Sequence, residues 1–252
     1  MKTVMITGGT RNTGFAIARL FAQKGWNVVI TSRDAEAAKA TALNLSQEFP
    51  IQSCGFALQI DSLDSIENTF KSVKQKFGQI HAFIANSASL GVGFDLLNTD
   101  EAQYDSIVDI NMKGTFFCCK EAAKLMMDSG GSIVTMGSVQ GMGAVAGRTV
   151  YGMTKAALSQ LTRSMAYELG QYGIRANNLV AGAIHSQRWD SLSVEEIAQR
   201  RSRYPAGRES LEEEIANAVW FLCSENAATI TGTDLTVDSG LSACLLPYQK
   251  KE

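Results

Sequence analysis

A regular alternation of short β-branched runs with longer amphipathic stretches constrains the fold of this chain more than any other feature. The runs are apolar at successive positions, as in residues 3–7 and 27–32, which is typical of parallel strands covered on both faces. Strands joined by helices in this way form a doubly wound α/β sheet, here predicted with about seven parallel strands. We expect strands over residues 3–7, 27–32, 51–60, 80–85, 132–137, 174–181 and 230–237.

The stretches between these runs carry apolar residues at three- and four-residue spacing, which predicts helices that cover the sheet. The predicted helices span residues 14–24, 35–48, 63–77, 101–128, 151–171 and 211–223. No internal repeat or Pro-rich linker divides the 252 residues, so we expect one domain over 1–252 with a short tail at 245–252. In such folds, ligands bind beyond the carboxyl ends of the strands.

Charge and cysteine content exclude several classes of function. Lys and Arg number 23 and Asp and Glu 25, so the formal net charge of −2 predicts no nucleic-acid partner and no binding to anionic membranes. The first strand begins at Thr3, which leaves no room for a signal peptide, and the five cysteines show no Cys-x-x-Cys spacing. We expect a reduced, cytoplasmic protein. Its two histidines are too few for a His-rich zinc site, and we predict no metal.

The first predicted strand runs directly into the glycine-rich turn Thr7-Gly8-Gly9-Thr10-Arg11-Asn12-Thr13-Gly14, and a helix follows. Glycines let the backbone turn tightly and approach a pyrophosphate, which sits at the helix N-terminus where free N–H groups point outward. A tight strand-to-helix turn without a ligand is the alternative interpretation of this segment taken alone.

Tyr151 and Lys155 stand four residues apart, so a phenol and an ammonium share one face of the predicted helix 151–171. Exposed pairs at this spacing are common, and a solvated helix face explains this pair when it is considered by itself. A functional interpretation of the pair is favoured because the glycine-rich turn lies near the start of the same alternating fold.

Together these motifs resemble the short-chain dehydrogenase/reductase family, and the resemblance runs from Thr3 to about Ser242. Ser138 precedes Tyr151 by 13 residues, as the family's catalytic serine does. The other matching segments, in chain order, are the turn at 7–14, Ala85-Asn86-Ser87-Ala88, Asn111 in Asn-Met-Lys-Gly, Val180-Ala181-Gly182-Ala183-Ile184, Ile230-Thr231-Gly232 and Val237-Asp238-Ser239-Gly240.

The resemblance implies an oxidoreductase that moves a hydride between a nicotinamide ring and a carbonyl carbon. By that resemblance Tyr151 exchanges the proton on oxygen, and Lys155 lowers the Tyr151 pKa and holds the nicotinamide ribose. Ser138 hydrogen-bonds the substrate oxygen, and Asn111 holds a water that links Lys155 to solvent. The catalytic residues expected are therefore Asn111, Ser138, Tyr151 and Lys155.

The resemblance also implies a set of cofactor-binding residues along the carboxyl ends of the strands. Asp61 is expected to end the third strand and to accept a hydrogen bond from the adenine amino group. The full expected set is Gly8, Thr10, Arg11, Asn12, Thr13, Gly14, Ser32, Arg33, Asp61, Ser62, Asn86, Tyr151, Lys155, Gly182 and Ile184.

The end of the second strand indicates which cofactor is used. An acidic residue there would bind a free ribose 2′-hydroxyl, but none occurs before Asp34, which follows Arg33. Arg11 and Arg33 can both reach that corner, and a guanidinium fork suits a phosphate, so we predict NADP(H). Two solvated arginines are the alternative.

Substitutions within the family motifs bear on affinity more than on fold. Asn12 replaces the middle glycine of the turn, and Asn tolerates left-handed backbone angles. Ala85 and Ala88 replace an Asn and a Gly, and Ala181 replaces a Pro. None of these substitutions removes a proton-transfer group.

Substrate choice is expected to reside in the loop at about 183–210 and in side chains facing it. The expected substrate contacts are Ser138, Gln140, Tyr151 and Gln187, with Arg148 as a further candidate. Within this loop the arginines are interpreted as a solvated helix face more readily than as an anion site; they are Arg188, Arg200, Arg201, Arg203 and Arg208.

The resulting hypothesis is an NADP(H)-dependent carbonyl reductase or alcohol dehydrogenase that acts on a small molecule. The alternative is a 3-oxoacyl-[acyl-carrier-protein] reductase, and the alternative from another class is a catalytically silent NADP(H)-binding sensor or scaffold. The resemblance implies a homotetramer assembled through the helices 101–128 and 151–171. Their outward faces are expected to include, in part, Phe116, Phe117, Met126, Met127, Leu158 and Leu161.

Overall fold

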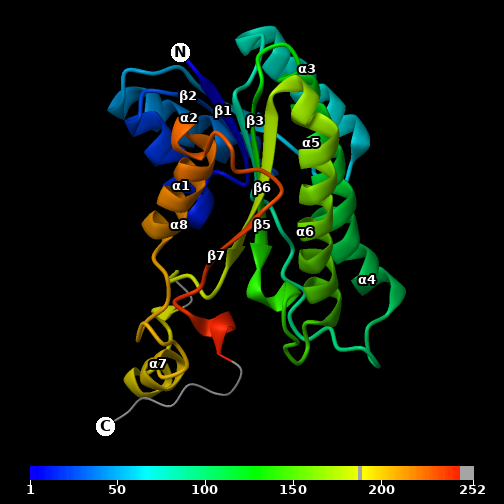
Figure 1. Cartoon of the computed structure of the whole chain (residues 1–252), viewed down its shortest axis with the longest axis vertical. Coiled ribbons are helices and arrows are strands. Elements are labelled where there is room, and N and C mark those ends of the chain that lie inside the picture. Colours follow the sequence, from blue (N-terminus) through cyan, green and yellow to red (C-terminus); the bar gives the residue numbers. More distant parts are fainter. Residues whose placement is uncertain (187–188, 245–252) are drawn as a thin grey trace.

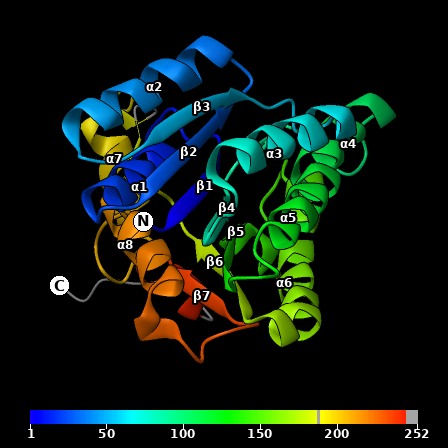
Figure 2. The same cartoon turned by 90° about the horizontal axis from the view of Figure 1, so that it is seen from above.

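A computed structural model describes residues 1–186 and 189–244 of the chain. Its centre is one parallel seven-stranded sheet in the order β3-β2-β1-β4-β5-β6-β7, with helices on both faces (Figures 1 and 2). The strands are β1 Thr3–Thr7, β2 Asn27–Ser32, β3 Ser53–Ala57, β4 Ala82–Ala85, β5 Gly131–Ser138, β6 Ile174–Ala181 and β7 Asp234–Val237. The predicted doubly wound fold is confirmed.

The helical segments lie between the strands in the expected alternation. They are α1 Asn12–Gln23, α2 Ala35–Glu48, α3 Leu63–Phe77, α4 Glu101–Val108, η1 Asp109–Gly114, α5 Thr115–Lys124, η2 Val139–Gly141, α6 Thr149–Leu169, η3 Gly170–Tyr172, α7 Val194–Arg201, α8 Glu212–Cys223, η5 Glu225–Ala227 and η6 Leu241–Ala243. Within the described residues, no helix combines the length and the hydropathy that a membrane span requires.

Alternation along each strand divides the core into two layers. In β1, Val4 and Ile6 point to the layer formed with α1, α2 and α8, whereas Met5 points to the layer formed with α3, α5 and α6. Figure 2 shows these two groups of helices on opposite sides of the sheet. Because both faces are covered, the interior strands β1, β2 and β4 are buried at successive positions, whereas the edge strands β3 and β7 are not.

Three strands are shorter than predicted. One of them, β4, begins at Ala82 and not at residue 80, and the other two are shortened for local reasons. The interval 51–60 contains β3 only over Ser53–Ala57, because the Ser62 N–H bonds Gln59 O in a turn after that strand. The interval 230–237 contains β7 only over Asp234–Val237; before it, Gly232 takes a φ of 76° and Thr233 N–H bonds the Asn177 side chain. Apolar residues follow β3, and β-branched residues precede β7, so the predicted boundaries were too wide.

The interval 101–128 is not one α-helix. A π-helical segment, η1, separates α4 from α5, and the helical run ends at Lys124. Gly114 closes η1 against the backbone of the turn after β3, where a Cβ would lie 2.2 Å from Ile60 O. The π-helical turn therefore forms where two backbone segments lie close together, and hydrophobic periodicity along the chain does not reveal this contact.

Several side chains expected on the outer faces of these helices are internal. Met126 and Leu158 are buried, and Phe117 and Leu161 pack against the core, whereas Phe116 and Met127 are exposed. The structure also contains α7, for which the sequence predicted no bounds, although its arginines were interpreted as a helix face; Ser193 and Glu196 form a capping box at its start.

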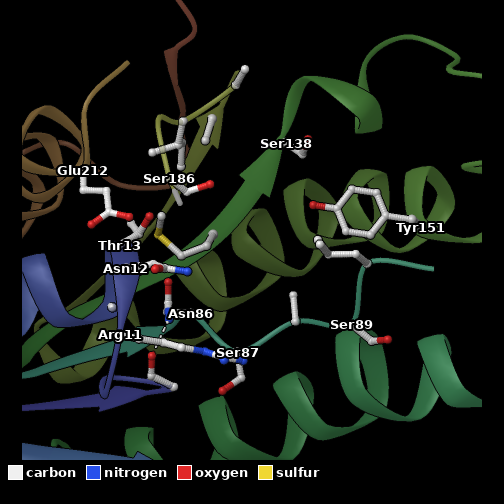
Figure 3. A pocket seen from close by; sticks show the side chains of 18 of the residues that line it. Arg11, Asn12, Thr13, Asn86, Ser87, Ser89, Ser138, Tyr151, Ser186 and Glu212 are labelled. Atoms are coloured by element: carbon white, nitrogen blue, oxygen red, sulfur yellow. Dashed lines mark hydrogen bonds between the residues drawn. The ribbon is translucent and has the colours of Figure 1, made fainter. Parts of the chain in front are cut away.

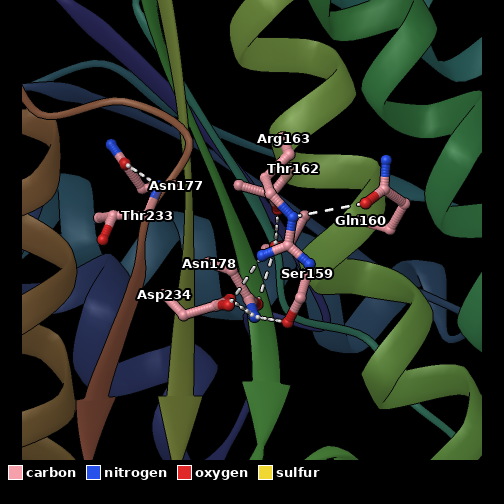
Figure 4. Close-up of polar contacts among 9 residues, drawn as sticks. Ser159, Gln160, Thr162, Arg163, Asn177, Asn178, Thr233 and Asp234 are labelled. Atoms are coloured by element: carbon pink, nitrogen blue, oxygen red, sulfur yellow. Dashed lines mark hydrogen bonds and ion pairs between the residues drawn. The ribbon is translucent and has the colours of Figure 1, made fainter.

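A buried polar network joins α6 to the sheet (Figure 4). Asn178 of β6 is fully buried, and its Nδ2 donates to Ser159 Oγ at 3.2 Å and to Asp234 Oδ1 at 2.7 Å. Its Oδ1 accepts from Thr135 Oγ1 at 2.9 Å, and that hydroxyl lies 2.9 Å from Thr162 Oγ1. The network fixes α6, which carries Tyr151 and Lys155, against β5, β6 and β7.

Candidate functional site

A cavity of about 1810 Å³ crosses the carboxyl edge of the sheet. Its walls come from the ends of β1, β2, β4, β5 and β6 and from the segment that follows β6. Figure 3 shows the turn residues Arg11, Asn12 and Thr13 on one side and Tyr151 on the other. This is the position that the doubly wound fold predicts for a ligand.

The glycine-rich turn forms one end of the cavity. Gly8 has a φ of 67°, and a Cβ on Gly14 would lie 2.2 Å from Gly8 O. Asn86 holds the turn from β4, because its Nδ2 donates to Thr7 O at 2.9 Å and to Gly8 O at 3.1 Å. Asn12 has a φ of 49°, which confirms that this residue occupies the left-handed position where the family has glycine.

The N-terminus of α1 is open toward the cavity. Arg11 stands at its N-cap position and forms no side-chain cap, so the first N–H groups of α1 lack that partner. The predicted turn residues Gly8, Thr10, Arg11, Asn12, Thr13 and Gly14 all line the cavity. The uncovered backbone and the helix N-terminus fit the pyrophosphate of a dinucleotide.

At the end of β2, Ser32 and Arg33, which were expected to bind the cofactor, line the cavity. Asp34 lines it too, but its Oδ1 accepts the N–H groups of Glu36 and Ala37 at 2.9 and 3.0 Å as the N-cap of α2. Capping therefore engages the Asp34 carboxylate, which would otherwise be available to bind a ribose hydroxyl.

Asp61 and Ser62 are placed differently from the prediction. Because β3 ends at Ala57, Asp61 lies in the turn beyond the strand and not at its end. Ser62 is the N-cap of α3 and accepts the N–H of Ser65 at 3.3 Å. The cavity is lined at this corner by Leu58 and Ile60.

Tyr151 and Lys155 lie at the other end of the cavity with Ser138. Tyr151 is 9% exposed and Lys155 is 5% exposed, so the solvated-face alternative is wrong. The Lys155 Nζ donates to Met136 O at 2.6 Å and lies 5.5 Å from the centroid of the Tyr151 ring. The fold therefore brings together the three residues that the motifs single out.

Burial governs the titration of this pair. Burial lowers the pKa of Lys155 to about 8, because the ammonium loses hydration. Burial also raises the pKa of Tyr151, and this is partly offset by a hydrogen bond with Ser138 and by the charge of Arg148. Arg148 lies with its Cζ 5.8 Å from the centroid of the Tyr151 ring. A second cation thus stands beside the phenol.

Asn111 is buried in η1 and does not line the cavity. Its Oδ1 accepts Ser89 N–H at 2.7 Å, and its Nδ2 donates to Ser89 O at 2.9 Å and to Thr154 Oγ1 at 3.2 Å. Asn111 therefore ties η1 to α6 and to the loop after β4, and one acceptor site on Oδ1 is left for a water.

The segment after β6 closes the far side of the cavity. Gly182 and Ile184, which were expected to bind the cofactor, line it, whereas Gln187 and Arg188 lie outside the described residues. Glu209 is buried beneath this segment and binds the Nε and NH2 groups of Arg201, each at 2.8 Å. These bonds, with His185 Nδ1 at 2.8 Å, lower the pKa of Glu209 to about 2 against the effect of burial.

The four described arginines of this segment divide into two pairs. Arg201 binds Glu209 and Arg208 binds Glu214, whereas Arg200 and Arg203 are exposed side chains that also line the cavity. Four further residues that line the cavity were not expected from the sequence: Ser89, Trp189, Tyr204 and Glu212. Trp189 and Tyr204 could have been identified, because they are aromatic side chains in an otherwise polar segment. Nothing in the local sequence distinguishes Ser89 or Glu212.

Comparison with known proteins gives consistent matches along the chain. Residues 8–242 match the family model described as enoyl-(acyl carrier protein) reductase. Carbonyl reductase family member 4 of Danio rerio is 34% identical over 240 residues, covering 95% of this chain and 98% of that protein. The human 3-oxoacyl-[acyl-carrier-protein] reductase is 32% identical over 245 residues, covering 97% and 99%.

A solved structure shares the whole architecture. It is a gluconate 5-dehydrogenase from Burkholderia cenocepacia J2315, in complex with NADP and tartrate, with a TM-score of 0.90 and 25% identity. The match covers 97% of this chain and 96% of that one. The three proteins are oxidoreductases by name, and the alignments span both ends of the cavity.

Proposed function

The chain belongs to the short-chain dehydrogenase/reductase family, oxidoreductases that use a nicotinamide cofactor, and we propose that it reduces carbonyl compounds with NADPH or runs the reverse reaction. One observation carries the proposal. A single cavity joins the open N-terminus of α1 to Ser138, Tyr151 and Lys155. This arrangement suits a reaction between an extended dinucleotide and a small molecule.

The cofactor would be held along the strand ends. The turn at residues 8–14 would hold the pyrophosphate, and Asn86, Gly182 and Ile184 would line the central part of the site. Lys155 would hold the nicotinamide ribose, and Asp61 and Ser62 would need the turn after β3 to shift toward the adenine. When bound, the nicotinamide supplies or accepts the hydride.

Proton transfer belongs to the side chains. The Tyr151 hydroxyl donates its proton to the substrate oxygen during reduction and takes it back during oxidation. Ser138 donates a hydrogen bond to the same oxygen and stabilises its developing charge. Lys155, with a pKa near 8, and a water on Asn111 would return the proton to Tyr151. Gln140 lines the substrate end, and Gln187 completes the proposed set of substrate contacts.

NADP(H) is the proposed cofactor, through Arg11 and Arg33. Both arginines line the adenosine end of the cavity, and neither forms an ion pair with any carboxylate in the described part of the chain. The structural neighbour with NADP is consistent with this choice. A guanidinium binds a 2′-phosphate through charge-assisted hydrogen bonds, while Asp34 is engaged in capping α2.

The function is tested by Tyr151→Phe, with NADPH oxidation followed in the presence of ketones. We expect the rate to fall by about 10²–10⁴-fold or more, because the transferable proton is lost, while NADPH binding changes little. Tyr167→Phe is the matched control, since Tyr167 lies on the same helix and is 90% exposed. More than a tenth of the wild-type rate in Tyr151→Phe would contradict the proton-transfer role.

A second candidate is a 3-oxoacyl-[acyl-carrier-protein] reductase, favoured by the human relative of that name. A faster rate with a 3-oxoacyl thioester than with any free ketone would support it. The silent sensor is disfavoured because Ser138, Tyr151 and Lys155 converge on the cavity. NADPH binding without any turnover would reinstate it.

The proposal also covers the assembly of the protein and its location in the cell. We propose one domain over residues 1–252 and a homotetramer that pairs α4, α5 and α6 with their symmetry mates, supported by exposed Phe116 and Met127. A reducing compartment such as the cytoplasm is consistent with the five cysteines, all of which are free thiols.

A further inference from the structure

We propose that Arg148 binds a carboxylate of the substrate, so that this enzyme acts on small ketones and alcohols that carry a free carboxylate near the reacting carbon. The inference rests on the proposed function and names the substrate class of that same site. Three features carry it: the fixed position of Arg148, its charge without an ion-pair partner among the described residues, and the unpartnered amide oxygen of Gln140 in the same cavity.

Arg148 is anchored at the mouth of the catalytic end. It immediately precedes α6 and pairs as an isolated β-bridge with Phe94. Its NH1 donates to Leu90 O at 2.5 Å, and its Cζ lies 5.8 Å from the Tyr151 ring centroid. The side chain is half-buried and lines the cavity. The guanidinium is therefore held over the phenol and does not need to be ordered by a ligand.

The charge of Arg148 is not neutralised within the described structure. It forms no ion pair with a described carboxylate, in contrast to Arg201 and Arg208 of the neighbouring segment. A guanidinium has five N–H donors, and the bond to Leu90 O accounts for one. The remaining donors can bind a carboxylate in a two-bond fork.

None of the described carboxylates that line the cavity forms an ion pair with Arg148. Arg200 and Arg203 line the same cavity from α7 and the turn after it, on the side away from α6 (Figures 1 and 2). Of the lining carboxylates, Asp34 caps α2 and Glu196 accepts Ser193 N–H in the capping box of α7. In Figure 3, Glu212 lies on the same side of the view as Thr13, across from Tyr151.

Gln140 supplies the independent observation. It follows Ser138 in η2, donating its backbone N–H to Ser138 Oγ at 3.2 Å, and its side chain lines the cavity. Its Oε1 is buried and has no hydrogen-bond partner among the residues described. A buried amide of this kind indicates a ligand, because its oxygen suits a hydroxyl and, turned by about 180°, its NH2 suits a carboxylate.

These positions select among the candidate substrates. Ser138 and Tyr151 hold the reacting oxygen, so a carboxylate on Arg148 belongs to a molecule of a few carbons. An acyl thioester has no carboxylate at that place and would leave the Arg148 charge uncompensated. The site therefore favours free oxo acids and hydroxy acids over carrier-bound acyl chains.

The kinetic test uses acetoacetate and methyl acetoacetate, which share a 3-oxo group but differ in charge. We expect wild-type protein with NADPH to prefer the acid by at least about tenfold in kcat/KM. Arg148→Met should lower that preference at least about tenfold, mainly through KM for the acid, and Arg148→Lys should lie between. Arg19→Met is the control, because Arg19 binds Glu48 on the outer side of α1.

The binding test titrates tartrate, and dimethyl tartrate as its neutral counterpart, into the complex with NADP⁺. We expect tartrate to bind wild type and Arg19→Met alike and Arg148→Met at least about tenfold more weakly. Equal tartrate affinity in wild type and Arg148→Met, or an ester preferred by the wild type, overturns the inference. NADPH that binds but is oxidised by no ketone contradicts the proposed function instead, and the tartrate titration still decides the role of Arg148.

Discussion

The buried ammonium of Lys155, which is proposed to act in the reaction, lowers the folding stability of the protein. Its ordinary pKa of 10.5 falls to about 8 through burial, so the folded protein carries a poorly hydrated ammonium at neutral pH. Between these two values the unfolded chain binds a proton that the folded protein has released, and wild-type stability therefore rises with pH. Below pH 8 the full penalty applies.

We accordingly expect Lys155→Met to stabilise the cofactor-free protein at pH 7. The expected gain is about 1–3 kcal/mol in the free energy of unfolding, once the loss of the hydrogen bond to Met136 O is subtracted. The difference should shrink between pH 8 and 10.5. Urea unfolding at pH 7 and pH 9 measures it, with exposed Lys74→Met as the control. A gain that does not change with pH would show that the charge of Lys155 is not its cause.

Arg33 should determine the choice between the two nicotinamide cofactors. A charge-assisted hydrogen bond contributes roughly 1.5–3 kcal/mol, so we expect NADPH to be preferred over NADH by at least about tenfold in kcat/KM. Arg33→Ala should remove most of this preference and leave the NADH rate almost unchanged. Lys39→Ala, exposed on the adjoining α2, should behave as wild type. Equal kcat/KM values in the wild type would mean that Arg33 points to solvent.

At the scale of elements, Asn178 connects three strands with α6. Asn178→Ala would leave Thr135, Ser159 and Asp234 without this partner inside the protein. We expect unfolding to become easier by about 1–3 kcal/mol, the cost of unsatisfied buried groups. Asn68→Ala, exposed on α3, should stay within about 0.5 kcal/mol of wild type in the same urea titration. An equally small effect for Asn178→Ala would show that water replaces the network.

At the scale of the whole molecule, the outer face of α4, α5 and α6 should form the tetramer interface. Phe116 is 49% exposed there, and a charge introduced into an apolar interface is costly. We expect Phe116→Glu to yield dimers or monomers by light scattering at micromolar concentration. Leu43→Glu is the control, since Leu43 is 58% exposed on α2. A monomeric wild type would contradict the assembly.

The sequence by itself determined the parts of this protein that depend on local order. Apolar runs alternating with amphipathic stretches specify a parallel sheet, because only strands buried on both faces need that composition. The bounds of β1, β2, β6, α2 and α3 follow from the sequence, and a left-handed backbone at Asn12 follows from residue chemistry. The spacing of Tyr151 and Lys155 likewise places them on one helical face.

Only the tertiary structure decided what depends on partners distant in the chain. The π-helical turn at Gly114 requires the backbone at Ile60, and Arg148 reaches its position through Leu90 and Phe94. Hydrophobic periodicity shows that one face of a segment is buried, but it does not show which residues that face contacts. Those residues lie in distant segments, and the local sequence does not specify which segments pair. For the same reason Met126 and Leu158 were expected outside and lie inside.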